Sequence, residues 1–347
     1  MTEPAEPLVS LVMPIYNAGR CLDEALASAT GQTLTDLEIL CVDDGSTDGS
    51  SAVLSAWVRR DPRVHVWTTA NHGEGHARNV ALAQARGRYL LFLDADDTLD
   101  PGAARELVAV AEASGADIVV YGGDGPPPDS WAYPVLHPRA AVRTDARAAL
   151  FDEPGSYPLI NKLVRRDLLE RHRLRFDQTL ALGVDTAFWF AAFPRAARVA
   201  YHPACLYHYR YHRDEAAVST YARDTAARVE AHLGLVESVC ATWRREGWLA
   251  EPDPAVLAWA VDLIASDAAQ LPRERCRAVA QRFVEVSARS GLVGAIDALD
   301  APTRRDLRSL VLARGVVTKT VNRVRRTGVG GTLRAVRAHL RRRRAGA

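Results

Sequence analysis

Three aspartates stand within four residues, directly after a short apolar run. The run covers residues 90–93, and Asp94, Asp96 and Asp97 follow it. An apolar run of this length is typical of a buried strand, which would place the carboxylates at its carboxyl end. Neighbouring carboxylates repel one another, and a divalent ion such as Mg²⁺ or Mn²⁺, which prefers oxygen ligands, would neutralise them. The alternative is a solvated acidic turn that caps the next helix, with Asp100 as the N-cap.

The elements that would position this cluster alternate between strands and helices. Apolar runs predict strands at residues 8–15, 37–42, 64–68, 89–93 and 117–121. Apolar residues at helical spacing predict the helices between them. This alternation is typical of an α/β fold with a mostly parallel, doubly wound sheet and right-handed crossovers. Ligands of such sheets bind outside the carboxyl ends of the strands, where polar residues follow the first four predicted strands.

The sequence lacks the glycine-rich loops that usually bind phosphates. No GxGxxG follows the first predicted strand, and no GxxxxGK[ST] occurs anywhere in the chain. Without such a loop, the charge of a bound diphosphate has to be neutralised in another way. The acidic cluster therefore favours a nucleotide diphosphate that is bridged to carboxylates by a divalent ion.

The composition is that of a globular chain with an uneven charge distribution. Its 347 residues can bury a substantial core, with 48% hydrophobic and 25% charged residues. Residues 304–347 hold 14 Lys or Arg and one acid, which leaves 30 basic and 41 acidic residues in the rest of the chain. Nucleic acid is not an expected partner, because the body is acidic and no aromatics interleave with the tail's arginines.

The basic tail, residues 314–347, carries apolar residues at helical spacing among its arginines, as at Val317, Val321 and Val324. A basic amphipathic helix can lie on an anionic membrane surface. The alternative is a solvated tail without a partner. The chain has no signal-peptide pattern at its start and no apolar run of the roughly 18–20 residues that cross a bilayer. We expect a cytoplasmic protein with peripheral contact at the inner face of the plasma membrane.

The cysteines form no pattern of their own. None is part of a CxxC, their number is odd, and they stand far apart, at Cys21, Cys41, Cys205, Cys240 and Cys276. This spacing argues against a disulfide framework or a zinc site, and it favours a reducing compartment.

Four ordered blocks resemble the inverting glycosyltransferases of family 2, which have the GT-A fold. They are VSLVMPIYN, EILCVDDGSTDGS, NHGEGHARNVALAQARGRYLLFLDADD and LGVDTAFW, within residues 8–211. The resemblance implies a nucleotide-sugar donor, with a UDP-sugar favoured, and a Mn²⁺ or Mg²⁺ ion. It also implies a glycan, polymer or lipid-linked acceptor, as in bacterial enzymes that build cell-surface polysaccharides.

The resemblance implies roles for residues along the predicted rim of the sheet. The nucleotide-binding set is Pro14, Tyr16, Asn17, Asp44, Arg78, Asn79, Asp94 and Ala95. Within it, Asp44 hydrogen-bonds the pyrimidine edge, Asp94 falls near the ribose, and the first three residues lie by the base. Asp96 is the ligand of the metal that holds the donor diphosphate. For Arg78, a charge on a helix surface is the alternative.

The family places its catalytic base in the block LGVDTAFW, at Asp185. We hypothesise that Asp185 accepts a proton from the acceptor hydroxyl as that hydroxyl attacks the anomeric carbon, which inverts this centre. An acid at a helix N-terminus is often only a cap. Relatives usually carry a Glu-Asp pair here, and Val184 stands in place of the Glu. This chain therefore lacks the carboxylate for any role of that Glu, such as orienting the acceptor.

Residues 205–212, CLYHYRYH, alternate tyrosines with polar side chains and predict a strand with two distinct faces. Similar segments of the family close the donor site, so we expect His208 and Arg210 to contact the diphosphate or the metal. The alternative is a strand with a polar outer face.

The interpretation divides the chain into four parts. They are the nucleotide-sugar half at 1–122, the acceptor half at 123–215, a helical region at 216–313 and the basic tail at 314–347. The QxxRW motif and membrane spans of processive synthases are missing from the sequence, which favours the transfer of one sugar per encounter.

Other functions compete with this interpretation. Residues 94–98 also fit the DxDxT pattern of haloacid-dehalogenase-like phosphatases, although that pattern normally opens the fold. A sugar-phosphate nucleotidyltransferase would share the sheet but should carry a Gly-rich, Arg-containing loop after its first strand. A non-enzymatic sugar- or nucleotide-binding module would need no base at Asp185.

Overall fold

The computed structural model describes residues 6–128, 133, 135–152, 161–210 and 224–311. Its N-terminal half contains four parallel strands, with β1 between β2 and β4 and with β3 beside β2. They are β1 (Val9–Ile15), β2 (Leu37–Asp43), β3 (Val64–Thr68) and β4 (Tyr89–Phe92). All four coincide with predicted strands. Their carboxyl ends therefore meet at one edge of the sheet, as the parallel arrangement requires.

Four helices connect these strands and the strand that follows them. They are α1 (Leu22–Thr30), α2 (Ser50–Arg60), α3 (Glu74–Gln84) and α4 (Ala103–Ser114). The alternative interpretation of the acidic turn made Asp100 the N-cap of α4; this is wrong, because the helix begins later, after Gly102. The short strand β5 (Thr98–Leu99) pairs with a distant strand, and the backbone N–H of Asp100 donates to Leu206 O. Asp100 instead accepts a hydrogen bond from the Gly102 N–H at 2.7 Å, within the turn before the helix.

The second half of the sheet mixes strand directions. Its strands are β6 (Ile118–Asp124), β7 (Ala141–Arg143), β8 (Lys162–Arg165) and β9 (Val199–His208). β8 lies antiparallel between β4 and β6, whereas β9 is parallel to β6 and also pairs with β5 and β7. β6 runs through Asp124, so the expected boundary between the two halves, at residues 122 and 123, falls inside a strand. The reason is that the backbone of this glycine pair continues the ladder with β9.

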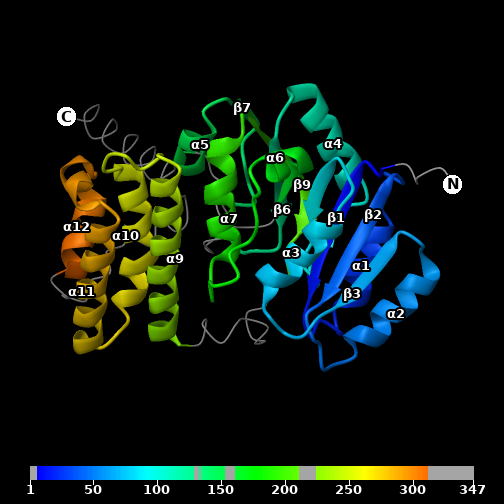
Figure 1. Cartoon of the computed structure of the whole chain (residues 1–347), viewed down its shortest axis with the longest axis horizontal. Coiled ribbons are helices and arrows are strands. Elements are labelled where there is room, and N and C mark those ends of the chain that lie inside the picture. The colour runs from blue at the N-terminus through cyan, green and yellow to red at the C-terminus, as the bar shows by residue number, and fades with distance from the viewer. Residues whose placement is uncertain (1–5, 129–132, 134, 153–160, 211–223, 312–347) are drawn as a thin grey trace.

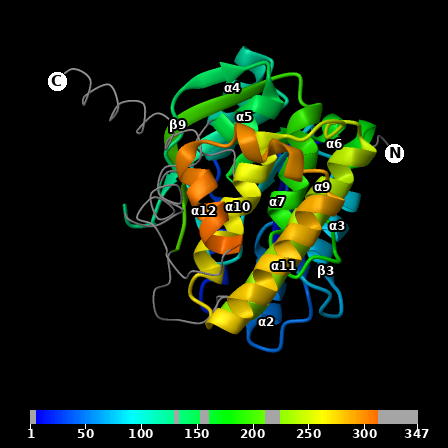
Figure 2. The same ribbon diagram turned by 90° about the vertical axis from the view of Figure 1, so that its left-hand side faces the viewer.

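Helices extend the molecule beyond the sheet. α7 (Val184–Ala192) packs between the sheet and the C-terminal helices α9 (Thr225–Arg245), α10 (Pro254–Ala268), α11 (Arg273–Arg289) and α12 (Ala301–Val311). These helices stand side by side at the end of the molecule opposite β3 and α2 (Figure 1), and they lie in front of the sheet in the view that faces them (Figure 2). The predicted class, a mostly parallel α/β sheet with a helical C-terminal extension, is confirmed.

Two apolar clusters cover the two faces of the sheet. Leu11 and Met13 belong to the cluster under α1 and α4, and Val12 belongs to the one under α3 and α7. This division follows from the alternation of side chains along a strand. The second cluster continues into the C-terminal helices, where Leu233, Val236 and Val239 are buried. Burial of such side chains is worth about 1.5–3 kcal/mol each, so the helices are joined to the sheet by a shared core.

Within the described residues, no helix is long and apolar enough to cross a membrane. The predicted basic tail, residues 314–347, lies outside them.

Candidate functional site

The loops after β1 and β2 interlock at the carboxyl edge of the sheet. Asn17 has a φ of 50°, in the left-handed region that asparagine tolerates better than most residues. Its side-chain Oδ1 accepts a hydrogen bond from the Thr47 N–H at 2.8 Å, and its own N–H donates to Ser46 Oγ at 3.0 Å. Beside it, Tyr16 is 51% exposed, and Pro14 lies in β1 opposite Val42. This arrangement presents the Tyr16 ring to solvent at the rim.

Asp44 joins the end of β2 to the start of α3. It is buried, and its carboxylate accepts hydrogen bonds from the Thr69 hydroxyl at 3.1 Å and from the backbone N–H groups of His72 and Gly73 at 3.0 and 2.7 Å. A carboxylate offers about four acceptor positions, so one remains for a ligand. The hydrogen bond of Asp44 to a pyrimidine stays a prediction.

Arg78 is a buried cation between the carboxylates of the site. It is 2% exposed, which excludes a charge on the helix surface. Its Nη2 donates to Asp94 Oδ1 at 3.1 Å, and its Nη1 pairs with Glu74 Oε2 at 3.1 Å. Burial by itself would lower the pKa of Arg78, but the charges of Glu74, Asp94 and Asp185 hold that pKa above its ordinary value. Arg78 is therefore charged, and it faces the acidic cluster and the predicted base together.

The three aspartates of the cluster differ in their partners. Asp97 is buried and accepts from the Tyr207 hydroxyl at 2.6 Å and the Arg210 N–H at 2.7 Å. Burial and the neighbouring carboxylates raise the pKa of Asp97 to about 8. Burial also raises the pKa of Asp94 to about 6, although Arg78 opposes the shift. These raised pKa values reflect carboxylates crowded together in a poorly solvated place.

Asp96 is the member of the cluster whose carboxylate is left for a ligand. It is partly exposed, and none of the described residues donates a hydrogen bond to that carboxylate. Its backbone oxygen accepts from Arg210 Nε at 2.9 Å, and Ala95 is buried beside it. An unpartnered carboxylate flanked by two others is a donor set that fits a hard divalent cation.

Asp185 lies in the first turn of α7 and faces α3 and β8. Its pKa is raised to about 7, because burial and the charge of Glu74 raise it more than Arg78 and Lys162 lower it. Lys162, on β8, is fully buried. Burial lowers the pKa of Lys162 to about 7, against the opposing charge of Asp185. A carboxylate with this pKa can exchange a proton near neutral pH.

Asn79 and aromatic side chains fix the position of α7. The Asn79 side chain donates to Phe176 O at 2.9 Å and accepts from the Phe176 N–H at 2.8 Å. The Phe176 ring stacks on Phe188 of α7, with their centroids 4.0 Å apart. Asn79 thus acts on α7 through Phe176, and its predicted contact with a donor remains untested.

His208 and Arg210 point to different partners. Besides contacting Asp96, Arg210 pairs with Glu24 on α1. His208 Nδ1 lies 3.0 Å from Asp124 Oδ1, at the end of β6. The structure thus brings Arg210 to the acidic cluster, whereas the partner of His208 is a residue that no sequence pattern had singled out.

Glu74 and Lys162 are the site residues that sequence reasoning missed. The only signal for Glu74 was an acid at a predicted helix start, which is common. Nothing in the sequence indicated that Lys162 is buried, because lysine is seldom buried. Asp44 contacts the N-terminus of α3, and Arg78 of α3 contacts Asp94 and lies near Asp185; the roles predicted for these residues stay predictions.

Comparison with known proteins shows which families the chain is similar to. The family model described as Glycosyl transferase family 2 matches residues 10–173. The uncharacterized glycosyltransferase EpsJ of Bacillus subtilis is 33% identical over 210 residues, 59% of this chain and 61% of that protein. The succinoglycan biosynthesis protein ExoO of Rhizobium meliloti is 30% identical over 226 residues, 62% of this chain and 64% of that protein. The chain thus spans somewhat over three fifths of these relatives.

Solved structures share the fold. The S. aureus protein TarS in complex with UDP superposes with a TM-score of 0.65 at 18% identity, over 92% of this chain and 91% of that one. The mannosyltransferase PcManGT from Pyrobaculum calidifontis, in complex with GDP-Man and Mn²⁺, has a TM-score of 0.53 at 20% identity, over 88% and 85%. The fold is therefore the GT-A fold of these structures. The chain is thus similar to glycosyltransferases of family 2, as its sequence predicted, and the phosphatase and nucleotidyltransferase alternatives are not favoured.

Proposed function

We propose that this protein is a metal-dependent, inverting glycosyltransferase. It transfers a sugar from a nucleotide-diphosphate sugar to a hydroxyl of a glycan, polymer or lipid-linked acceptor. The observation that carries the proposal is the buried Arg78, which contacts Asp94 of the acidic cluster and faces Asp185. A donor bound at the cluster would therefore lie beside a carboxylate that can take up a proton.

The donor side uses the rim of the parallel strands. We propose that the pyrimidine base of the nucleotide binds at the exposed ring of Tyr16 and at the remaining acceptor position of Asp44. Asn17 and Pro14 shape the loop. A UDP-sugar is the favoured donor, because TarS has been crystallised with UDP and with UDP-GlcNAc, although PcManGT holds GDP-Man. Asp94 and Ala95 would lie next to the ribose.

The residues around Asp96 fit a Mn²⁺ or Mg²⁺ ion. Bound there, the ion would neutralise the charge that develops on the departing nucleoside diphosphate. Asp97 keeps its contacts with Tyr207 and Arg210, so it holds the end of β9 over the cluster. Arg210, bonded to the Asp96 backbone, places a second positive charge beside the diphosphate.

Asp185 acts as the base in this proposal. Its carboxylate removes the proton of the acceptor hydroxyl while the oxygen attacks the anomeric carbon from the face opposite the diphosphate. This single displacement inverts the anomeric centre. The pKa of about 7 that burial gives Asp185 matches the task at neutral pH. The positive charges of Arg78 and Lys162 favour the charged form of Asp185.

The relatives suggest a place for the reaction in polysaccharide synthesis. ExoO is described as a succinoglycan biosynthesis protein, and shorter matches of 42% and 39% identity are chondroitin synthases. We therefore propose that the acceptor is a growing polysaccharide or its lipid-linked precursor, and that the reaction takes place at the cytoplasmic side of the membrane.

The proposal is tested with UDP-, GDP- and CDP-sugars, with Mn²⁺ present or removed by EDTA. We expect metal-dependent release of one nucleoside diphosphate from the purified protein. The variant Asp96→Asn should lose the dependence on metal together with most activity. The variant Asp185→Asn should lose at least about a hundredfold in rate, as expected for a missing general base, while donor binding in a thermal-shift assay persists.

Two outcomes would contradict the proposal. Near-normal turnover by Asp185→Asn would remove this residue from the role of base. Release of phosphate from simple phosphomonoesters, with no nucleotide-sugar turned over, would instead favour the phosphatase alternative. Asp152, the exposed last residue of the helix Ala146–Asp152, is not part of the acidic cluster and provides the matched control Asp152→Asn.

A further inference from the structure

The ladder between β6 and β9 contains two register shifts near its end. Ile118 to Tyr121 pair regularly with Val199 to His202, and then Gly122 pairs with Cys205, Gly123 with Tyr207 and Asp124 with His208. β9 therefore contributes extra residues to this stretch, as in a β-bulge, which re-aims side chains. One consequence is that Cys205 and His208 both come next to Asp124.

The two glycines of β6 allow this irregular pairing. A Cβ atom on Gly122 would lie 2.7 Å from Ala204 O, and one on Gly123 would lie 2.3 Å from Tyr207 O. Both distances are too short for a real contact, so only glycine lets the β9 backbone approach this closely. The convergence of side chains at Asp124 is thus built into the backbone of both strands.

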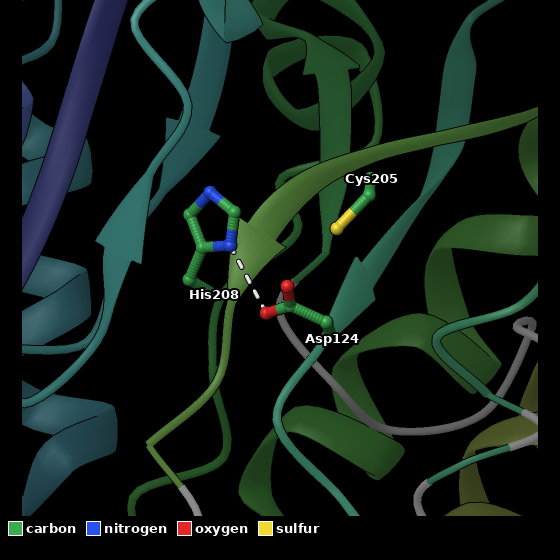
Figure 3. A group of neighbouring side chains, drawn as sticks. All are labelled: Asp124, Cys205 and His208. Carbon is green, nitrogen blue, oxygen red and sulfur yellow. Dashed lines mark hydrogen bonds and ion pairs between the residues drawn. The ribbon is translucent and has the colours of Figure 1, made fainter.

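Asp124, Cys205 and His208 form one compact cluster (Figure 3). One ligand atom from each lies within 4.8 Å of the other two, and His208 Nδ1 is 3.0 Å from Asp124 Oδ1. His208 is partly buried, whereas Asp124 and Cys205 are exposed. The cluster is therefore accessible from solvent, and partial burial restrains the His208 side chain. Among the residues that the structure describes, these three side chains form a group that could hold a metal ion.

The three ligand types select a particular kind of cation. A thiolate, a carboxylate and a neutral imidazole carry two negative charges in total, which a divalent ion balances. Sulfur and imidazole nitrogen suit Zn²⁺ and similar ions, whereas the oxygen-only group at Asp96 suits Mg²⁺ or Mn²⁺. On binding, the Cys205 thiol would release its proton to solvent, and His208 would keep its proton on Nε2 so that Nδ1 can bind the ion.

We propose that Asp124, Cys205 and His208 are three ligands of a Zn²⁺-type ion, with the fourth position open to water. The site shares no ligand with the acidic cluster and does not depend on the proposed transferase activity. It fastens the end of β9 to β6. Because Tyr207 and Arg210 of that end hold Asp97 and Asp96, zinc would stabilise this side of the candidate active site.

The test measures zinc on the full, untagged chain, stripped with a chelator and dialysed against Zn²⁺. We expect one equivalent in the wild type and less than a tenth of that in Cys205→Ser and in His208→Ala. Cys21→Ser and Asp96→Asn are controls that should keep one equivalent of zinc, because neither residue is one of the three proposed zinc ligands. Co²⁺ in place of Zn²⁺ should give a thiolate-to-cobalt absorption band that Cys205→Ser lacks.

Zinc should also raise the melting temperature of the wild type and leave that of Cys205→Ser unchanged. Matching circular dichroism of the metal-free proteins would show that the variants are folded. The proposal is overturned if the wild type retains no stoichiometric zinc, or if Cys205→Ser retains as much as the wild type. Neither readout requires a sugar donor or an acceptor.

Discussion

At the residue scale, the candidate site is governed by a charge balance around Arg78. A buried guanidinium is unfavourable unless carboxylates compensate it, and Glu74 and Asp94 both contact this one. Glu74 is more than half exposed, so it can respond to solvent and to ligands. Glu74 also supplies a second acid close to Asp185. Val184, which stands where relatives usually carry a Glu, has no carboxylate. This observation motivates a prediction on pH dependence.

The variant Glu74→Gln should extend activity to lower pH. Asp185 must be deprotonated to act as a base, and the negative charge of Glu74 raises its pKa. Removing that charge favours the ionised form, so the pKa of Asp185 falls and the acidic limb of the kcat/KM profile moves to lower pH. The pH profile of kcat/KM measures this shift.

Glu106, which pairs with His202 on another face, supplies the matched control for this experiment. Glu106→Gln should leave the profile of the wild type unchanged. An acidic limb of Glu74→Gln that stays in place, or moves to higher pH, would show that Glu74 does not control the ionisation of Asp185.

At the scale of elements, α3 and the Phe176 segment position the helix that carries Asp185. Asn79 reaches this segment with two hydrogen bonds to the backbone of Phe176, whose ring stacks on α7. The same residue was predicted to lie near the donor. Stability and binding measurements distinguish these two roles.

Asn79→Ala should lower stability without changing donor affinity. The N–H and C=O of Phe176 lose their hydrogen-bond partner. Each of these groups that stays buried lowers the free energy of unfolding by about 1–3 kcal/mol. We therefore expect a lower free energy of unfolding in urea, a reduced kcat, and a nucleotide Kd close to that of the wild type. Gln84→Ala, at an exposed position of the same helix, should change none of these quantities. A markedly weaker nucleotide Kd at full stability would instead support direct contact of Asn79 with the donor.

Gly123 lies where β6 and β9 approach each other closely. A Cβ at this position would lie 2.3 Å from the Tyr207 carbonyl oxygen, and this oxygen belongs to the backbone, which cannot simply rotate away. Gly123→Ala should therefore destabilise the protein by about 1–3 kcal/mol, the usual range for overpacking. Denaturant titration checks this value. Gly49→Ala is the control, because a Cβ there meets nothing within 4 Å. Equal stability of both variants would mean that the β6–β9 approach is not tight.

At the scale of the whole molecule, a charge asymmetry separates the body from its tail. Residues 304–347 carry nearly a third of the basic residues of the chain, while the rest is acidic. The tail lies outside the described residues, so its contact with a membrane stays a prediction from sequence. An acidic body that is repelled by anionic lipid would need such a tail to approach the membrane.

Truncation after Arg314 should abolish the binding of the protein to vesicles that contain anionic lipid. Cosedimentation at low salt measures this binding, and added salt should weaken that of the full chain because the attraction is electrostatic. Neutral phosphatidylcholine vesicles should bind neither form. Undiminished binding of the truncated protein to anionic vesicles would refute the membrane role of the tail.

Local patterns in the sequence determined much of this protein. Apolar runs located the parallel strands, and helical spacing predicted the helices between them, because both signals depend on residues close in the chain. The cluster at Asp94 and Asp96 was visible for the same reason. Its interpretation as part of a transferase also needed the four blocks that resemble a family.

Only the tertiary structure decided how distant residues meet. The burial of Arg78, the nearness of Glu74 and Lys162 to Asp185, and the antiparallel insertion of β8 all depend on contacts between separate elements. The five cysteines had argued against a zinc site, because sequence reasoning counts ligands that stand close together. Cys205 joins Asp124 through a register shift that two glycines permit. Such a shift arises from packing between strands, and no local pattern of residues specifies it.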